Sequence, residues 1–269
     1  MLTDDIFDLE KSYEYILSIQ VSLGGFSFSV VSAETNKLLA FEHTPLKISN
    51  DKFIARRFSE WAGSLEIFQK PFKKYKVIVF DEKFTLVPEK FISKKIKREI
   101  PRLLFSKNEN PEIAENYIRH KHTKLIFALP PGLNEAIKEV SEEYEIIHPV
   151  KIIIEQLPET KRNGLILLFD SKILYIVIYS DGTLLMANSF RVNHTNDVIY
   201  YVLTVLKQLN IKPDSTESYF AGSVSPDDET IHQLSKYLGP LKGLPNKKQI
   251  EFNQNVFTVP ATQNLSIYA

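Results

Sequence analysis

The chain has 269 residues, and its 33 Lys and Arg balance 33 Asp and Glu, so the formal net charge is zero. No overall field therefore draws it to nucleic acid or an anionic membrane. The absence of cysteine excludes disulfides, thiolate metal sites and thiol nucleophiles. The N-terminal stretch is acidic rather than signal-like, and no apolar run approaches the roughly 18 residues of a membrane span. We therefore expect a cytoplasmic protein without a membrane span.

The first part of the chain predicts three strands, an amphipathic helix, a further strand and a further helix. Alternating or continuous apolar residues define the strands, and apolar residues at helical spacing define the first helix. In chain order these elements cover residues 15–21, 26–32, 37–43, 52–69, 76–80 and 91–105.

The middle of the chain predicts a second strand and helix module. A short helix is expected to end at Tyr117 and to be followed by a buried strand. The remaining elements are expected at residues 124–129, 133–144, 145–147 and 149–156, the last being a helix that Pro149 opens well. A linker rich in helix breakers follows at 157–163, so we place two domains at residues 1–158 and 159–269.

The second part repeats the order of the first. Strands are predicted at 165–169, 173–179 and 184–190, with Asp181 and Gly182 forming a hairpin turn. A helix at 197–209, a strand at 218–221 and a helix starting at Pro226 and ending at 238 follow, and the tail holds one possible strand at 255–259.

The repeat can be aligned residue by residue. The sequence ILSIQVS, which ends at Ser22, lies over LILLFDS, which ends at Ser171, and FSFSVVS lies over LYIVIYS. A spacing of about 150 residues is too long for a solenoid and favours a duplicated domain.

Two meanders, each followed by a helix, resemble the actin-like ATPase fold of actin, Hsp70, sugar kinases and the pilus-assembly actin-like proteins. The resemblance implies an α/β fold of two RNase H-like domains, each a mixed sheet with a three-stranded antiparallel meander and helices. In that family each meander opens on an Asp-x-Gly hairpin that cradles phosphate. Here the Asp position falls on Gln20 and on Phe169, with Ser22 and Ser171 at the glycine positions. A slip of one residue brings Asp170 into register instead.

A second family feature, the turn that receives adenosine, is better preserved. YFAGSVSPDDETIHQLSKYL is similar to the family's strand, Gly-Gly-x-Ser turn and helix, with Ala221 and Gly222 at the glycine pair. The resemblance therefore implies a nucleotide cleft lined by Gln20, Ser22, Gly24, Gly25, Asp170, Ser171, Gly222 and Ser223. The chain also resembles a bacterial family of uncharacterised proteins with degenerate actin-like folds.

Two functions remain open on these residues. Because glutamine cannot anchor a metal as a carboxylate does, the first is a pseudo-ATPase with no cofactor, a scaffold that binds another protein or itself. The alternative is a divergent nucleotide-binding protein or kinase that uses the cleft with ATP and Mg²⁺, since backbone amides and hydroxyls can hold a phosphate.

Other candidate sites have plainer explanations. A metal at His120 and His122 is less favoured than a solvated basic loop. The basic run at residues 94–102 is better explained as a solvated helix face than as a nucleic-acid site. Asp227, Asp228 and Glu229 suit the positive end of a helix.

Overall fold

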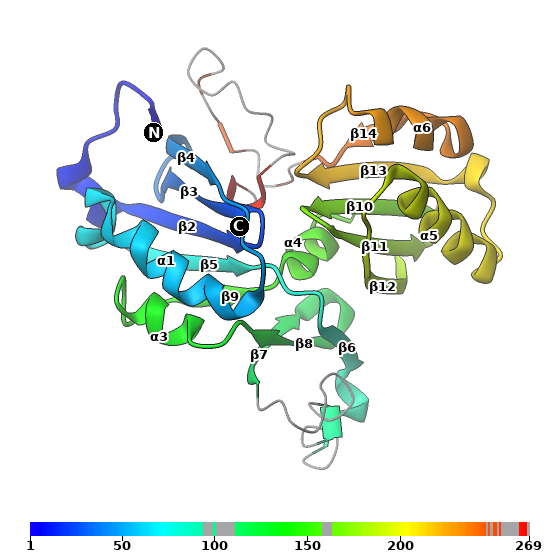
Figure 1. Ribbon diagram of the computed structural model, residues 1–269, viewed down its shortest axis with the longest axis horizontal. Helices are drawn as coiled ribbons and strands as arrows, with labels where there is room; N and C mark the ends of the chain where they lie inside the picture. The colour runs from blue at the N-terminus through cyan, green and yellow to red at the C-terminus, as the bar shows by residue number, and fades with distance from the viewer. Residues whose placement is uncertain are drawn as a thin grey trace.

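The computed structural model describes residues 1–93, 99–100, 111–157, 163–245, 247, 250, 251, 253 and 264–267. Two sheets form the two halves of the molecule, a six-stranded sheet in the order β1-β4-β3-β2-β5-β9 and a five-stranded sheet in the order β12-β11-β10-β13-β14. Figure 1 shows them side by side, with helix α4 (Pro149–Glu155) between them. A smaller antiparallel sheet, β6-β8-β7, lies below the first half in this view.

In the first half, the six-stranded sheet packs one apolar face against helices. Its strands are β1 (Leu2–Thr3), β2 (Tyr15–Ser22), β3 (Gly25–Ser32), β4 (Leu38–Pro45), β5 (Lys74–Val79) and β9 (Glu145–Ile147), and its helices are α1 (Ile54–Gly63) and α3 (Leu133–Lys138). Phe26 and Phe28 of β3 pack against the ring of Trp61 in α1. These rings bury a large apolar area and fix the helix on the sheet.

The second half is built around a strand that is buried on both faces. Its elements are β10 (Gly164–Asp170), β11 (Ile173–Ser180), β12 (Thr183–Arg191), α5 (Thr195–Gln208), β13 (Glu217–Gly222), α6 (Glu229–Leu238) and β14 (Leu241–Gly243). Leu167 of β10 packs in the cluster beneath α5 and α6, whereas its neighbour Leu168 packs in the core shared with the first half. The continuous apolar run of β10 is explained by these two buried faces.

The two large sheets are copies of one arrangement. The order β4-β3-β2-β5-β9 in the first repeats as β12-β11-β10-β13-β14 in the second. The first copy differs by the small sheet of β6 (Phe84–Pro88), β7 (Glu112–Ile118) and β8 (Thr123–Leu129), which is inserted between β5 and α3. The predicted duplication is therefore present, but α3 is the helix that matches α6. The helix predicted over 91–105 lies largely outside the described residues.

Several predicted elements differ from the observed ones. The helix expected to end at Tyr117 is wrong, because these residues form β7, in which buried Asn116 alternates with exposed Tyr117 and pairs with β8. The helix expected over 52–69 ends at Gly63, and a separate 3₁₀ turn covers Glu66–Gln69. The helix expected over 133–144 ends at Lys138. The strand expected over 255–259 lies outside the described residues.

Helix starts were predicted to within a few residues. The helix expected at Pro226 begins at Glu229, because the Asp228 side chain accepts a hydrogen bond from Thr230 N at 2.8 Å and caps the helix there. The helix expected at 197 begins at Thr195, with Asp197 accepting the amide of His194 at 3.0 Å. Short polar side chains thus set both starts.

Candidate functional site

The hairpins that open the two halves end next to each other. The first turns at residues 23–24, between β2 and β3, and the second turns at 171–172, between β10 and β11. A methyl group in place of the Gly24 hydrogen would lie 3.5 Å from Ser171 Cβ and 3.8 Å from Asp170 Oδ1. Half of the predicted cleft residues therefore come together at one point: Ser22, Gly24, Asp170 and Ser171.

The hairpins also determine how the two copies align. Ser22 pairs with Gly25 across a two-residue turn, and Asp170 pairs with Ile173 in the same way. Ser22 therefore matches Asp170, and the alignment predicted from the sequence, which set Ser22 over Ser171, is wrong by one residue. The alternative slip, which would have set Asp170 over Gln20, runs in the opposite direction and is wrong as well. The pattern of hydrophobic residues specifies register poorly where a strand such as β10 is apolar throughout, so only the turns decide it.

We call the place where the two hairpin turns meet, at residues 22–24 and 170–171, the seam. Asp170 is buried there. Its Oδ2 atom has no hydrogen-bond partner in the described part of the chain. Burial raises the pKa of Asp170 to about 7, and a hydrogen bond with Ser22 opposes this rise. The Tyr175 hydroxyl lies in the same core without a described partner, and burial raises the pKa of that phenol well above its usual value. A large fraction of Asp170 is therefore neutral at pH 7.

The predicted adenosine turn is packed onto the end of β10. A Cβ at Gly222, where φ is +93°, would lie 2.0 Å from Phe169 O. Ser223 N donates to the same carbonyl at 2.8 Å. The Ser223 hydroxyl donates to it at 3.2 Å and accepts the amide of Ser171 at 3.2 Å. These polar groups are therefore satisfied within the protein.

Two predicted residues lie apart from this group. Gln20 Oε1 accepts a hydrogen bond from Leu265 N at 3.1 Å, so its side chain holds the C-terminal segment. Gly25 begins β3, where it pairs with Ser22 and Pro45 as part of the sheet. The seam therefore gathers Ser22, Gly24, Asp170, Ser171, Gly222 and Ser223, while Gln20 and Gly25 serve the first sheet.

A cleft of about 790 Å³ opens beside the seam and is lined from both halves. Its charged residues are of mixed sign, namely Lys47, Asp51, Asp81, Glu82, Lys83, Lys172 and Arg191. Arg191 Nε donates to Glu82 Oε2 at 2.6 Å, and a second Arg191 nitrogen contacts the other Glu82 oxygen. Burial raises the pKa of Asp81 to about 7, although the Lys83 amide opposes the rise. Four basic residues thus face three acids, of which Asp81 is partly neutral at pH 7, so the cleft carries a small positive excess.

Sequence reasoning missed Asp81, Glu82 and Arg191. A signal existed for the two acids, because they follow β5 after one residue, Phe80, at the carboxyl end of a parallel pair, where ligands of α/β sheets gather. Nothing in the sequence pointed to Arg191, whose partner Glu82 is 109 residues away.

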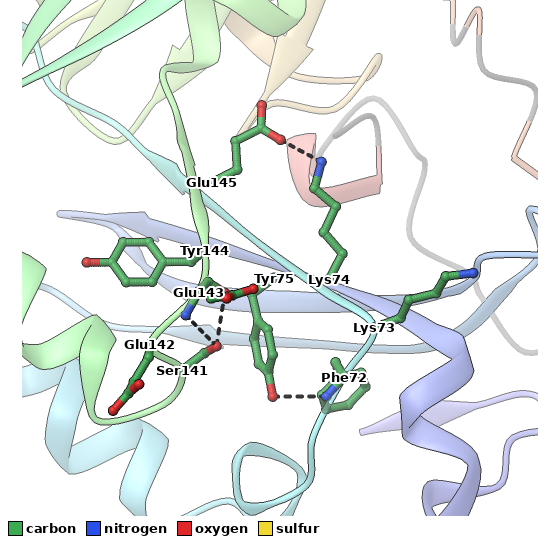
Figure 2. Close-up of a pocket in the computed structure, with 9 residues that line it drawn as sticks. All are labelled: Phe72, Lys73, Lys74, Tyr75, Ser141, Glu142, Glu143, Tyr144 and Glu145. Carbon is green, nitrogen blue, oxygen red and sulfur yellow. Dashed lines mark hydrogen bonds and ion pairs between the residues drawn. The ribbon is translucent and has the colours of Figure 1, made fainter.

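A second pocket, of about 560 Å³, lies at the other end of β5 (Figure 2). Lys74 Nζ contacts Glu145 Oε2 at 2.8 Å across its wall. The Tyr75 hydroxyl accepts the amide of Phe72 and donates to Lys70 O, both at 3.0 Å. None of the predicted cleft residues lines this pocket, so it is separate from the seam.

The remaining candidates do not form a site with these residues. The His122 side chain is exposed and lies 3.9 Å from Glu89, whereas the side chain of His120 lies outside the described part. Among the residues that the structure describes, no three His, Cys, Asp or Glu side chains gather where they could hold a metal ion. Most of the basic run at 94–102 is likewise outside the described ranges. In those ranges no helix has the length and apolar character to span a bilayer.

Comparison with protein families gives one match. The model for a family described as "Protein of unknown function (DUF3822)" matches residues 4–240. No curated protein matches the sequence.

Solved structures resemble the chain over nearly its whole length. A Bacteroides thetaiotaomicron protein with an actin-like ATPase fold and unknown function is 20% identical, with a TM-score of 0.81 and 97% of each chain covered. A PilM–PilN type IV pilus biogenesis complex gives 13% identity, a TM-score of 0.61 and coverage of 94% and 95%. EutJ from Carboxydothermus hydrogenoformans is 8% identical, with a TM-score of 0.51 and coverage of 91% of this chain and 87% of that chain. Together these matches confirm the predicted actin-like fold and the predicted kind of family.

Proposed function

Because this chain belongs to the DUF3822 family, and because its fold is that of the actin-like ATPases, we propose that it is a non-catalytic protein-interaction module, a pseudo-ATPase. The observation that carries this proposal is the closure of the Gly222–Ser223 turn onto the end of β10. Of the groups that the resemblance assigns to a nucleotide, the Ser171 amide and the amide and hydroxyl of Ser223 form hydrogen bonds within the protein instead.

The turn argues against a phosphate ligand through its hydrogen bonds. The Ser171 amide and the Ser223 hydroxyl satisfy each other at 3.2 Å. A phosphate that recruited either group would have to replace this exposed hydrogen bond, which contributes about 0.5–1.5 kcal/mol. Backbone carbonyl Phe169 O, which also faces the turn, would repel an anion.

The carboxylate chemistry also fits ATP with Mg²⁺ poorly. Mg²⁺ favours ionised carboxylates and octahedral oxygen ligation. Asp170 is buried, and its pKa of about 7 reports an environment that disfavours the ionised form. Gln20, at the Asp position of the first hairpin, has no charge and is engaged by Leu265. We therefore derive no catalytic step through this cofactor.

The interaction half of the proposal draws on the relatives of this fold. One of the similar structures is a PilM–PilN complex, in which a protein of this fold is assembled with another protein. At 13% identity that likeness carries the fold alone, so a protein partner, or a second copy of this chain, enters here as our proposal.

The alternative is a divergent nucleotide-binding protein or kinase. The observation in its favour is the cleft of about 790 Å³, which brings Lys47, Lys172 and Arg191 to the mouth of the two hairpins. Because Glu82 neutralises Arg191, and because Asp51 lies in the same lining as the lysines, we rank it second.

A thermal-shift titration separates the two functions. We expect ATP with Mg²⁺, and ADP, to leave the melting temperature unchanged at millimolar concentration. A ligand at 100 times its dissociation constant would add about 2.7 kcal/mol to the free energy of unfolding. A dose-dependent rise would overturn the proposal, and its loss in Gly24→Ala, whose added methyl group would lie 3.5 Å from Ser171 Cβ, would locate the ligand at the two hairpins. Gly63→Ala, in open space, is the matched control.

A further inference from the structure

Strand β3 has the sequence pattern of a strand with one face in water. Its apolar residues Phe26, Phe28 and Val30 face α1, and they alternate with Ser27 and Ser29 on the other face. Such alternation is typical of an antiparallel sheet that is solvated on one side. Yet both serines are completely buried. Another part of the chain therefore covers the hydrophilic face of β3 that carries Ser27 and Ser29.

The cover is the C-terminal segment, residues 264–267. Figure 1 draws its short 3₁₀ turn (Leu265–Ile267) in red beside β2 and β3. The Ser27 hydroxyl bonds the Asn264 side-chain amide, with 3.2 Å to Oδ1 and 3.1 Å to Nδ2. The Ser29 hydroxyl donates to Ser266 O at 2.9 Å. Gln20 Oε1 accepts the Leu265 amide at 3.1 Å.

Apolar contacts complete this attachment. The Leu265 side chain is fully buried in the main core, and Ile267 packs in a cluster with Val31, Leu38 and Phe41. The segment is therefore held by two apolar side chains, Leu265 and Ile267, and by the polar contacts of Asn264, Leu265 N and Ser266 O, as a bound peptide would be.

We propose that this face of β2 and β3 is a peptide-binding site, which the chain fills with its own residues 264–267 and from which a peptide of a partner protein displaces them. This inference rests on the proposed interaction function and names its location. The peptide that fits carries an amide side chain, then a branched apolar residue, a small polar residue and a second branched apolar residue.

The polar side chains under the segment, Gln20, Ser27 and Ser29, form the floor of the site and lower the free-energy cost of displacing it. When the segment leaves, the hydroxyls of Ser27 and Ser29 and the amide of Gln20 can hydrogen-bond water, so few buried polar groups are left unsatisfied. The opposite face of β3, lined by Phe26 and Phe28, has no such option. A segment that never left this face would be expected to cover apolar residues of the sheet, as α1 does on the opposite face.

The contacts also explain why a peptide is the fitting ligand. Leu265 N and Ser266 O are backbone groups, so their two hydrogen bonds are available to any sequence. Selectivity comes from Asn264, whose amide pairs with Ser27, and from the buried Leu265 side chain. The floor of the site is the face of two inner strands, whose side chains, and not a free strand edge, bind the peptide backbone.

The experiment supplies the segment as a separate molecule. The probe is a fluorescein-labelled peptide of the sequence ATQNLSIYA, residues 261–269, and fluorescence anisotropy measures its affinity for the full-length chain. In the wild type the attached segment competes at an effective concentration in the millimolar range, so we expect weak binding. Leu265→Asp expels the attached segment, and we expect at least about tenfold tighter binding of the peptide.

Variants of the floor test the location. Adding Ser27→Ala and Ser29→Ala to Leu265→Asp should weaken peptide binding about tenfold, because two hydrogen bonds are lost. Ser215→Ala, at an exposed serine bonded only locally to Lys212 O, is the matched control and should leave the affinity unchanged.

Equal peptide affinity for the wild type and Leu265→Asp, or binding that ignores the two serine changes, would overturn the inference. Should Leu265→Asp fail to fold by circular dichroism, Asn264→Ala provides the same comparison with a smaller change. A peptide that does not bind, together with a flat ATP titration, would reject this site while leaving the pseudo-ATPase proposal in place.

Discussion

Ser22 and Asp170 occupy equivalent positions at the ends of β2 and β10, and both side chains lie beside Gly24 where the two halves meet. A duplicated strand end thus carries a hydroxyl in one copy and a carboxyl in the other. The carboxyl gains one polar contact and loses most of its hydration, which is why its pKa is raised. The seam is therefore a place where pH should affect stability.

Replacing Asp170 by asparagine should flatten the dependence of stability on pH. The folded-state pKa of about 7 lies above the ordinary value of 3.8, so the folded protein binds the proton more tightly than the unfolded chain does. The contribution of this group is then greatest below about pH 4 and is lost as pH rises to 7, by up to about 1.4 kcal/mol per pH unit. Asp170→Asn should show a shallower decline and exceed the wild type at pH 8.

Urea denaturation at pH 5, 6, 7 and 8 measures this effect. Asp197→Asn is the control, since backbone hydrogen bonds from Asn193 and His194 lower the pKa of Asp197. Its replacement should shift stability equally at all four pH values. An unchanged slope in Asp170→Asn would show that the carboxyl is not the group that titrates. In Asp170→Asn the stability should still fall as pH rises, but less steeply than in the wild type, because Asp81, whose pKa is also about 7, continues to titrate.

The turn after β13 should tolerate no side chain. In Gly222→Ala the new Cβ would lie 2.0 Å from Phe169 O, at a backbone φ of +93°. We expect a loss of about 3 kcal/mol or more in the free energy of unfolding, since backbone strain adds to the clash. Gly239→Ala is the matched variant, because its φ is +73° but nothing lies within 4 Å.

Thermal and urea denaturation of both variants separate clash from strain. Gly239→Ala should lose less, about 1–3 kcal/mol, from backbone strain alone, since its φ of +73° and ψ of −167° lie in a region nearly confined to glycine. Similar losses in the two variants would mean that the turn can move away from the end of β10. In that case the closure that supports the pseudo-ATPase proposal would be weaker than the contacts suggest.

The strands were predictable because their patterns are local. Apolar runs such as 165–169 and alternation such as that of β3 specify strands without knowledge of the fold. The order of elements then predicted the duplication. The register between the copies was not predictable, because the apolar run of β10 can slide by one residue at little loss of hydrophobic pattern. Asn116 shows a further failure, since a buried polar residue concealed the alternation of β7.

The candidate site was predictable where it depends on neighbours in sequence. Ser171 and Ser223 were named from short motifs and do meet. Contacts between distant segments were not predictable: Gln20 and Leu265 are 245 residues apart. Such pairs depend on how the two halves and the C-terminal segment pack, which no local pattern encodes.

Two tyrosines with opposite hydrogen bonding give the last prediction. The buried hydroxyl of Tyr175 has no partner in the described part of the chain, whereas that of Tyr75 accepts Phe72 N and donates to Lys70 O. Removing an unsatisfied buried hydroxyl relieves a desolvation penalty, and removing a satisfied one leaves its partners unpaired. Tyr175→Phe should therefore raise the free energy of unfolding by about 1 kcal/mol, and Tyr75→Phe should lower it by a similar amount.

Urea denaturation at pH 7 of both variants provides the measurement. The two substitutions delete the same atom from the same residue type, so differences in side-chain volume and packing cancel. If Tyr175→Phe were as destabilising as Tyr75→Phe, the Tyr175 hydroxyl would have to be bonded in solution, and Asp170, whose charge raises the pKa of this phenol, would be the first partner to test. Combining Tyr175→Phe with Asp170→Asn would then give a non-additive change in stability, because residues that share a hydrogen bond are coupled.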